Sequence, residues 1–293
     1  MRRGQGFLFV LPWLIGFLLW SAGPLLASAA LSFAHWDLLS PPRFAGAAQY
    51  AHLVRDPLVR IALTNSLYLT LAGVPLALLL ALALALGLHG VAAARAHWMR
   101  TLLYLPSQLP AAASAVLWLW IFNPDYGIAN RLLGLVGAPS SLWLLSPVTA
   151  KPTLILVGFW GVGTGVLLLS AGLAAIPLDV LEAARLDGAR GLTHLRYILL
   201  PLLSPLLLFN LVVGLVATMQ AGFTQVYVMT GGGPDNSTLT LPLYMFRVGW
   251  RDFHMGYAAA IAWLFFAVLL ALVGAVFALA RRHVHYGVGG SNY

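Results

Sequence analysis

Six long stretches without a single charged side chain constrain this chain more than any other feature. Each is at least as long as the roughly 20 helical residues that cross about 30 Å of hydrocarbon. They cover residues 7–33, 65–88, 102–122, 153–176, 199–221 and 257–280. The whole chain is 61% hydrophobic and only 8% charged, whereas soluble domains carry about 25% charged residues. We therefore expect an all-α, polytopic integral membrane protein with six transmembrane helices, forming a single transmembrane domain over residues 1–293.

The first stretch needs a separate interpretation, because it follows Arg2 and Arg3 as the apolar core of a secretory signal would. Residues 27–29, Ala-Ser-Ala, also resemble a signal cleavage site. However, the apolar core of a signal is about 7–15 residues long, and residues 7–33 exceed that length. The sequence therefore favours an uncleaved first transmembrane helix.

Basic residues predict the orientation, because they concentrate in the cytoplasmic loops of membrane proteins. With both termini in the cytoplasm, the inner segments hold nine arginines: Arg2, Arg3, Arg95, Arg100, Arg185, Arg190, Arg196, Arg281 and Arg282. The outer loops hold seven basic residues but are much longer: Arg43, Arg55, Arg60, Arg131, Lys151, Arg247 and Arg251. The higher density of positive charge favours cytoplasmic termini.

The residues missing from the six stretches argue against several function classes. None contains Asp, Glu, Lys, Arg or His, although ion-coupled carriers and membrane-embedded enzymes usually keep ionisable groups at membrane depth. The chain has no cysteine, which excludes disulfides and thiolate metal sites. We expect no catalytic residue and no metal site. The net charge of +8 lies mostly at the ends of apolar stretches, where basic residues orient helices, so we expect no nucleic-acid partner.

The stretches do contain neutral polar and small residues that suit a hydrogen-bonding pathway. We predict that such a pathway runs beside stretches four and five and uses Gly163, Thr164, Asn210, Gln220, Thr224 and Tyr227. Neutral donors and acceptors suit sugar hydroxyls, and a tyrosine adds an amphipathic ring. The alternative is that these residues serve helix packing, because small residues dominate helix contacts in membranes.

Residues 177–198, between stretches four and five, predict a short helix on the cytoplasmic face. Pro177 suits the first position of a helix, and Glu182 falls in an early turn, where the helix dipole favours acids. Arg185 follows at a favourable helical spacing, and Gly188 can end the helix in a left-handed conformation. An ordinary charged connector is the alternative, but Glu182 is the only glutamate in the chain.

The order of residues in this segment and just beyond it resembles the EAA loop of binding-protein-dependent ABC importer permeases. The matching residues are Glu182-Ala183-Ala184, Asp187-Gly188-Ala189, Ile198, Leu200-Pro201 and Pro205. Leu195 stands where the family often has phenylalanine, which keeps an apolar contact. The resemblance implies that an ATPase-coupling site is formed by Glu182, Ala183, Ala184, Arg185, Asp187, Gly188, Ala189, Ile198 and Pro201.

A second set of residues resembles the sugar-type permeases, and in particular the first of their two paired permease subunits. It comprises residues 230–234 (Thr-Gly-Gly-Gly-Pro), Ser237-Thr238, residues 256–260 (Gly-Tyr-Ala-Ala-Ala), Gln49-Tyr50, Asp56-Pro57, Asn65-Ser66, residues 122–127 and Asn130. The resemblance therefore covers nearly the full chain. Taken alone, the glycine-rich residues 230–234 are better interpreted as a plain turn.

The resemblance implies a type I ABC importer permease fold in a bacterial or archaeal inner membrane. It implies three kinds of protein partner: a second permease forming a heterodimer, two ATP-binding subunits and an extracytoplasmic solute-binding protein. It also implies contact with membrane lipid and a carbohydrate substrate. The carbohydrate would be an oligosaccharide, a polyol or a glycerol phosphate ester.

This chain cannot itself be the ATPase, because its only lysine, Lys151, precedes Pro152 and a nucleotide-binding P-loop needs Gly-Lys-Ser/Thr. We expect no cofactor in the chain; ATP and Mg²⁺ would be bound by the partner ATPase. The alternatives are a permease for a non-sugar solute, a membrane-embedded enzyme, and a self-sufficient channel or carrier.

Overall fold

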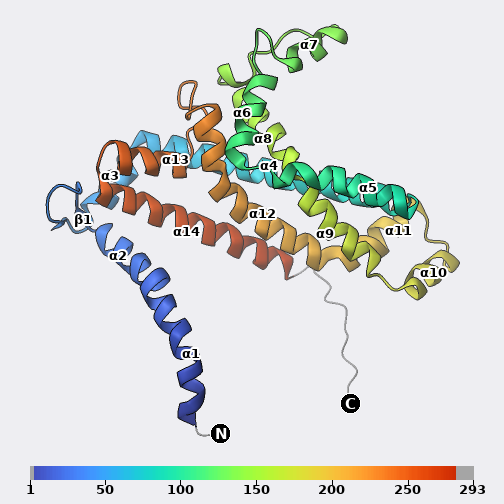
Figure 1. Cartoon of the computed structure of the whole chain (residues 1–293), viewed down its shortest axis with the longest axis horizontal. Helices are drawn as coiled ribbons and strands as arrows, with labels where there is room; N and C mark the ends of the chain where they lie inside the picture. The colour runs from blue at the N-terminus through green and yellow to red at the C-terminus, as the bar shows by residue number, and fades with distance from the viewer. Residues whose placement is uncertain (1–2, 282–293) are drawn as a thin grey trace. The chain divides into compact units, whose positions relative to one another are not determined.

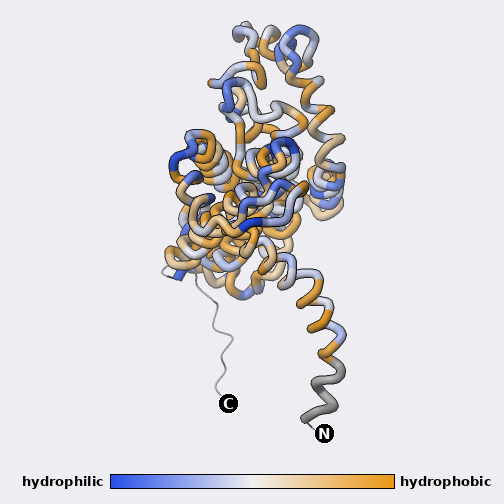
Figure 2. The backbone as a smooth tube through the Cα atoms, turned by 90° about the vertical axis from the view of Figure 1, so that its left-hand side faces the viewer, coloured by the Kyte–Doolittle hydropathy of each residue, from blue (hydrophilic) through white to orange (hydrophobic). Residues whose placement is uncertain are grey.

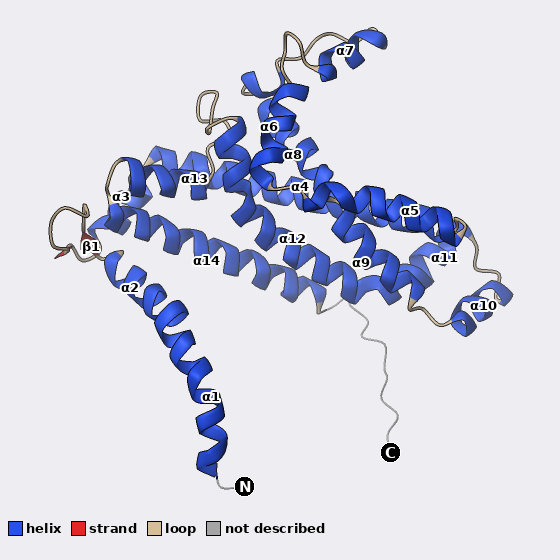
Figure 3. Ribbon diagram, in the orientation of Figure 1, coloured by secondary structure: helices blue, strands red, loops and turns tan. Residues whose placement is uncertain are grey.

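The computed structural model describes residues 3–281 and is built almost entirely from helices (Figure 3). Within that range, the strands are β1 (Ala34–His35) and β2 (Arg43–Phe44), which pair in antiparallel register with Ala34 opposite Phe44. The all-α prediction is confirmed. Arg2 and Arg282, on which the orientation argument partly rests, lie outside the described residues.

The chain forms two compact units, each made of segments from distant parts of the sequence. One unit comprises Met1–Leu63 and Leu241–Val268, and the other comprises Thr64–Thr240 and Leu269–Tyr293. Two long helices, α4 (Pro57–His89) and α14 (Met255–Ala280), contribute residues to both units (Figure 1).

The first unit combines an N-terminal helix, the short hairpin and several short helices. Besides β1 and β2 its elements are α1 (Arg3–Phe17), η1 (Leu18–Ala22), α2 (Gly23–Leu31), α3 (Ala48–Arg55), α13 (Leu241–Phe246) and η6 (Arg247–Arg251). The beginning of α14 lies directly on the hairpin: a Cβ atom at Gly256 would stand 1.9 Å from the Ala34 carbonyl oxygen. Only glycine permits this approach. The Met255 N–H also donates to the Trp36 carbonyl over 2.9 Å.

A partly buried polar cluster ties three segments of the same unit together. The carboxylate of Asp56 accepts hydrogen bonds from the hydroxyls of Tyr244 (2.5 Å) and Tyr257 (2.6 Å), and from the N–H of Leu58 (2.8 Å). Asp56 thereby joins the start of α4 to α13 and α14. Burial disfavours its ionised form, but these hydrogen bonds and the charge of nearby His52 together hold the pKa of Asp56 below its ordinary value.

The second unit contains most of the remaining helices. Its elements are α5 (Ala93–Tyr104), η2 (Leu105–Gln108), α6 (Ala111–Ile121), α7 (Ile128–Leu135), η3 (Trp143–Leu145), α8 (Ala150–Gly158), η4 (Phe159–Gly161), α9 (Gly163–Ala174), α10 (Leu178–Leu186), α11 (Gly191–His194), η5 (Leu195–Leu199) and α12 (Leu200–Met229). Its core brings together leucine, valine and alanine side chains of α4, α9, α10 and α12, including Ala85, Leu169, Leu181 and Leu203.

Within residues 3–281, four helical segments are long and apolar enough to cross a membrane, and two bent pairs bring the number to as many as six. The four are Val10–Leu31, Pro57–His89, Gly191–Gln220 and Met255–Ala280. The bent pairs are Ala93–Gln108 with Ala111–Ile121, at 100°, and Ala150–Gly161 with Gly163–Ala174, at 49°. Figure 2 shows hydrophobic residues along most of the helical length.

The sharp bend falls inside the predicted stretch 102–122, which is therefore not one straight helix. Leu109 is extended, with φ −72° and ψ 139°. It precedes Pro110, and a proline disfavours helical backbone at the residue before it.

Candidate functional site

The second unit contains a cavity of about 550 Å³ among α4, α6, α8, α9 and α12. This volume lies within the range of small-molecule sites, about 300–1,000 Å³. Within residues 3–281, no side chain of Asp, Glu, Lys, Arg or His lines it. Its walls combine apolar side chains with neutral hydroxyl and amide groups, so the cavity can offer hydrogen bonds without offering a charge.

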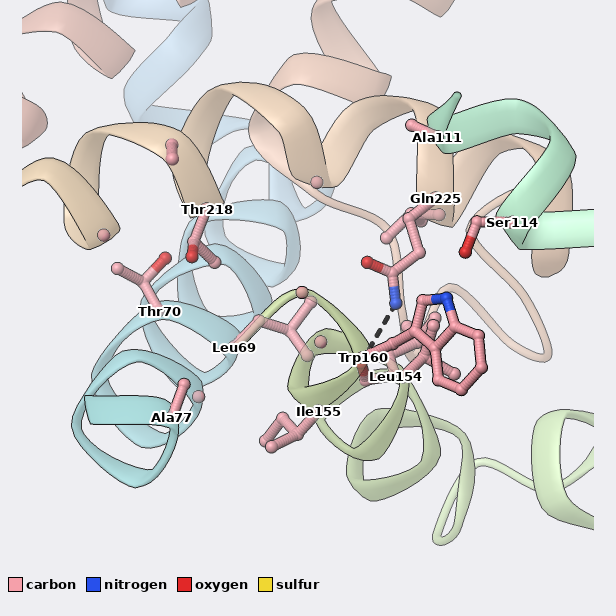
Figure 4. A pocket seen from close by; sticks show the side chains of 18 of the residues that line it. Leu69, Thr70, Ala77, Ala111, Ser114, Leu154, Ile155, Trp160, Thr218 and Gln225 are labelled. Carbon is pink, nitrogen blue, oxygen red and sulfur yellow. Dashed lines mark hydrogen bonds between the residues drawn. The ribbon is translucent and has the colours of Figure 1, made fainter. Parts of the chain in front are cut away.

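The neutral polar groups come from several helices and converge on the cavity (Figure 4). Thr70 on α4 and Thr218 on α12 turn their hydroxyl groups toward each other, and Ser114 on α6 lies nearer Trp160. Gln225 on α12 donates from its amide nitrogen to the Leu154 carbonyl over 3.0 Å. That bond satisfies one amide proton and orients the rest of the group.

Trp160, in η4, is the aromatic residue of the cavity wall. Its indole N–H is buried and has no hydrogen-bond partner among the described residues, although buried tryptophans usually find one. The ring meets Trp118 edge-on, with centroids 5.3 Å apart, and Trp118 stacks on Phe122 at 5.2 Å. Trp160 therefore combines a fixed ring with a free donor.

A polar network stands beside the cavity, next to its lining residues Ser66 and Thr240. The buried amide of Asn65 donates to the carbonyls of Asn236 (2.9 Å) and Leu239 (3.0 Å), and accepts from Lys151 Nζ (3.2 Å). Asn65 thus holds α4, α8 and the turn after α12 together. Neither the contact of Lys151 nor this role of Asn65 was predicted from the sequence.

Of the predicted path residues, Thr164 lines the cavity, whereas Gly163, Asn210, Gln220, Thr224 and Tyr227 do not. Gly163 is a packing residue in the structure: a Cβ there would stand 2.0 Å from the Leu103 carbonyl oxygen. The Asn210 amide donates to the carbonyl of Leu206 over 3.2 Å, and Gln220 is exposed. A role of these residues elsewhere along the path stays a prediction.

No role was predicted from the sequence for Thr70, Ser114, Trp160 or Gln225, although one sequence pattern bears on Gln225. Several of the lining residues of α12 follow a helical spacing, which places them on one face: Gly214, Thr218, Gly222 and Gln225. Thr218 is a neutral polar residue of the predicted stretch 199–221, and helical spacing groups it with Gln225 rather than with Gln220.

The segment after α9 folds as the sequence predicts. Pro177 precedes α10, and Gly188 follows it with a φ of +80°. The N–H of Ala189 donates to the Ala184 carbonyl over 2.9 Å and that of Gly188 to the Arg185 carbonyl over 3.1 Å. This pair of bonds is the glycine-ended helix stop known as the Schellman motif.

The helix α10 has two distinct faces. Leu181 and Ala184 are buried, and Leu181 belongs to the core of the second unit. Glu182, Ala183 and Arg185 are exposed, and the apolar side chains of Leu178 and Leu186 beside them are 71% and 89% exposed. The small side chain of Ala184 therefore faces this chain's own core.

The other residues assigned to coupling lie further along the same segment. Asp187 is exposed at the end of α10, Ala189 and Ile198 are half-buried, and the half-buried Pro201 stands in the first turn of α12. The segment thus presents charged and apolar groups outward while it is anchored inward.

Comparison with known proteins places the chain among transport proteins. The family described as "binding-protein-dependent transport system inner membrane component" matches residues 73–286. The probable ABC transporter permease protein YesP of Bacillus subtilis is 37% identical over 96% of this chain and 92% of its own length. The lactose transport system permease protein LacF of Rhizobium radiobacter is 30% identical over 95% of this chain and 94% of its own length. The sulfoquinovosyl glycerol transport system permease protein SmoG of Agrobacterium fabrum is 32% identical over 82% of this chain and 78% of its own length.

Solved structures agree on the fold. A chain of the bacterial alginate ABC transporter, crystallised with its alginate pentasaccharide-bound periplasmic protein, superposes with a TM-score of 0.83. That match covers 98% of this chain and 97% of the other, at 22% sequence identity. A chain of an amino acid ABC transporter gives a TM-score of only 0.51 at 17% identity, and the match covers 80% of this chain and 97% of the other. The chain therefore has the fold of ABC importer permeases, and it belongs to the family of binding-protein-dependent transport system inner membrane components, as a transport subunit rather than an enzyme.

Proposed function

We propose that this chain pairs with a second permease to form the translocation path for an uncharged sugar or polyol. An extracytoplasmic binding protein would deliver the cargo, and two separate ATP-binding subunits, holding ATP and Mg²⁺, would drive the transport. Both termini lie in the cytoplasm in this proposal, which puts α10 on the side of the ATPase.

The observation that carries this proposal is the cavity with hydroxyl, amide and indole groups and no charged lining residue among those described. Sugars present many hydroxyl groups and apolar ring faces, which Thr70, Thr218 and the ring of Trp160 can meet. A relative named for lactose supports a carbohydrate cargo. Others are named for sulfoquinovosyl glycerol and for sn-glycerol 3-phosphate, but a sulfonate or a phosphate ester would need cationic partners, which are absent from the cavity wall among the described residues.

The proposed route of coupling runs through α10. Its exposed face, with Glu182, Ala183 and Arg185, would contact the ATPase, while Leu181 on the opposite face is packed in the core formed with α4, α9 and α12. A displacement of α10 by the ATPase would therefore move the helices that surround the cavity. Alternating access needs such a link between two discrete helix packings.

The cargo is identified first, and the cavity is then tested. Sugars and polyols that raise the melting temperature of the cognate binding protein identify the cargo, and the purified complex is reconstituted for uptake measurements. Trp160→Phe keeps the ring and removes the free donor, so uptake should fall about fivefold, the equivalent of one hydrogen bond of about 1 kcal/mol. Gln225→Leu removes the amide from the cavity wall and should also lower uptake.

Gln220→Leu is the matched control, because it makes the same substitution on the same helix outside the cavity. It should leave uptake near the normal rate with both permeases and both ATPase subunits assembled. Equal effects of the two glutamine substitutions would contradict the assignment of the cavity. A binding protein stabilised by amino acids and not by sugars would favour a non-sugar permease instead.

A further inference from the structure

A second pocket, of about 330 Å³, lies between α5 and α9. From α5 it is lined by His97, Arg100, Thr101 and Tyr104, and from α9 by Leu167, Ser170, Ala171 and Ala174. Both sets follow the spacing i, i+3, i+4, i+7, so each represents one face of its helix. The pocket therefore sits where two helix faces meet.

Two buried polar atoms at this pocket lack a hydrogen-bond partner. Among the described residues, neither Nε of Arg100 nor Oγ of Ser170 is paired, and Ser170 as a whole is only 5% exposed. Unpaired buried polar groups are uncommon and carry a free-energy cost. Both residues line the pocket, so their unpaired atoms point to a ligand there that accepts hydrogen bonds.

The charge of the pocket restricts what that ligand can be. His97 and Arg100 are basic, and the chain's eight carboxylate residues, all within the described range, are absent from the lining. Guanidinium, imidazole and hydroxyl groups together present mostly donors, which match the oxygens of a phosphate group. A basic pocket between helices at the end of membrane spans is typical of binding sites for anionic lipid headgroups.

The surroundings of the pocket favour a lipid over a soluble phosphate. On α5, next to the lining residues, Trp98 is 69% exposed and Leu102 is 67% exposed. Exposed tryptophan is typical of the level of the lipid headgroups, and exposed leucine can meet acyl chains. The pocket also lies at the end of α9 that leads into α10, because its lining residue Ala174 is the last residue of α9 and Pro177 follows closely.

We propose that this pocket binds the phosphate group of an anionic ligand, with a membrane phospholipid as its source, and that the bound headgroup holds α5 against α9 beside the coupling helix. The proposal does not depend on the nature of the cargo. Phosphatidylglycerol is the probe, because it is a simple anionic phospholipid with a single phosphodiester.

The test uses the purified complex of this chain with its second permease and ATPase subunits. Its phosphatidylglycerol affinity is measured by native mass spectrometry after lipid titration, and its melting temperature in nanodiscs of phosphatidylcholine with and without phosphatidylglycerol. Arg100→Gln should weaken phosphatidylglycerol binding about tenfold, the effect of losing one charge-assisted contact. It should also remove the rise in melting temperature that the anionic lipid gives to the normal complex.

Arg95→Gln is the matched control, because it removes the same charge from an exposed position of α5 that does not line the pocket. It should keep both the affinity and the stabilisation. Ser170→Ala removes only a hydroxyl group and provides the same test if Arg100→Gln fails to assemble, because it should also weaken phosphatidylglycerol binding. Arg100→Lys keeps the positive charge and should bind phosphatidylglycerol more tightly than Arg100→Gln.

Inorganic phosphate added to phosphatidylcholine nanodiscs separates the two sources. Stabilisation by phosphate alone, lost in Arg100→Gln, would keep the anion site and refute the lipid as its source. Equal phosphatidylglycerol affinity in the normal complex, Arg100→Gln and Ser170→Ala would overturn the proposal. So would loss of the second permease in these variants with no change in lipid binding, because the pocket would then belong to a protein interface.

Discussion

Two residues show how an acid acquires different roles from its surroundings. Glu182 stands exposed on α10 beside exposed apolar side chains, whereas Asp56 is tied to two tyrosine hydroxyls within the first unit. An exposed acid on a short helix contributes little to the chain that carries it, about 0.2–0.5 kcal/mol even with a well-spaced arginine. Glu182 would contribute more to the binding of a partner protein than to the stability of α10. Asp56, in contrast, stabilises its own unit.

The first prediction concerns Glu182 as the charged contact with the ATPase. If the carboxylate pairs with a basic group in a partly desolvated interface, Glu182→Ala should cost about 2–5 kcal/mol of binding. We therefore expect release of the ATPase subunits, or ATP hydrolysis without uptake, while the two permeases still assemble. Co-purification measures the release of the ATPase subunits, and the ratio of ATP hydrolysed to cargo imported measures the coupling.

Asp179→Asn is the control for Glu182, because it removes an acid from the first turn of the same helix. It should retain the ATPase and most of the transport. Normal coupling in the Glu182→Ala complex would leave that residue only its small effect on the stability of α10.

The second prediction follows from the lowered pKa of Asp56. An acid whose pKa falls on folding stabilises the folded state above its ordinary pKa of about 3.9. That contribution is lost as the pH falls through this value toward the lower folded pKa. Asp56→Asn should therefore destabilise the chain at pH 7, by about 1–2 kcal/mol for weakened hydrogen bonds to a charged group. The difference from the normal chain should shrink below about pH 4.

Thermal unfolding of the detergent-purified complex at both pH values measures this difference. Asp125→Asn, at an exposed position of another loop, should change the unfolding temperature little at either pH. A loss of stability for Asp56→Asn that does not depend on pH would mean that the charge of Asp56 is not what the tyrosines stabilise.

At the scale of elements, the break between α8 and α9 lets α9 approach α5 closely. The paired segments bend by 49° at Val162, and Gly163 then meets the backbone of Leu103 and Tyr104. Because these neighbours are backbone atoms, they cannot move aside as a flexible side chain can. The glycine is thus explained by helix packing, which small residues commonly serve in membranes.

The third prediction tests that contact. Gly163→Ala would place a Cβ 2.0 Å from the Leu103 carbonyl oxygen, and overpacking of this kind costs about 1–3 kcal/mol or more. The variant should melt at a lower temperature and give less assembled complex. Gly158→Ala has no atom within 4 Å of the added Cβ and should be tolerated. Equal stability of the two variants would contradict the close packing of α9 on α5.

At the scale of the whole molecule, the orientation in the membrane is the fourth prediction. The chain has no cysteine, so single cysteines can be introduced without a background. Ser140 and Thr193 are both exposed and lie on opposite sides of the membrane if both termini are cytoplasmic. Ser140→Cys should react with a membrane-impermeant maleimide in spheroplasts, and Thr193→Cys should react only after permeabilisation. The reverse pattern would overturn the orientation and the placement of α10 beside the ATPase.

The sequence by itself was sufficient to predict the helical membrane fold and the residues at which α10 begins and ends. Long uncharged stretches cross hydrocarbon as helices, because a helix pairs its backbone polar groups within the segment itself. Likewise, a proline before the helix and a glycine after it act through local backbone geometry. These conclusions depend on neighbouring residues only, so no tertiary structure was needed to reach them.

Only the tertiary structure decided which polar residues face the cavity and which pack. Helices that are apolar on all sides carry no periodic signal for their rotation, so the sequence could not show that the face with Gln225, rather than the face with Gln220, lines the cavity. It also could not pair Asn65 with Lys151, which is 86 positions away, or bring Arg100 to Ser170. Such contacts depend on how each helix is rotated and packed against its neighbours, which the side chains of the whole unit determine together.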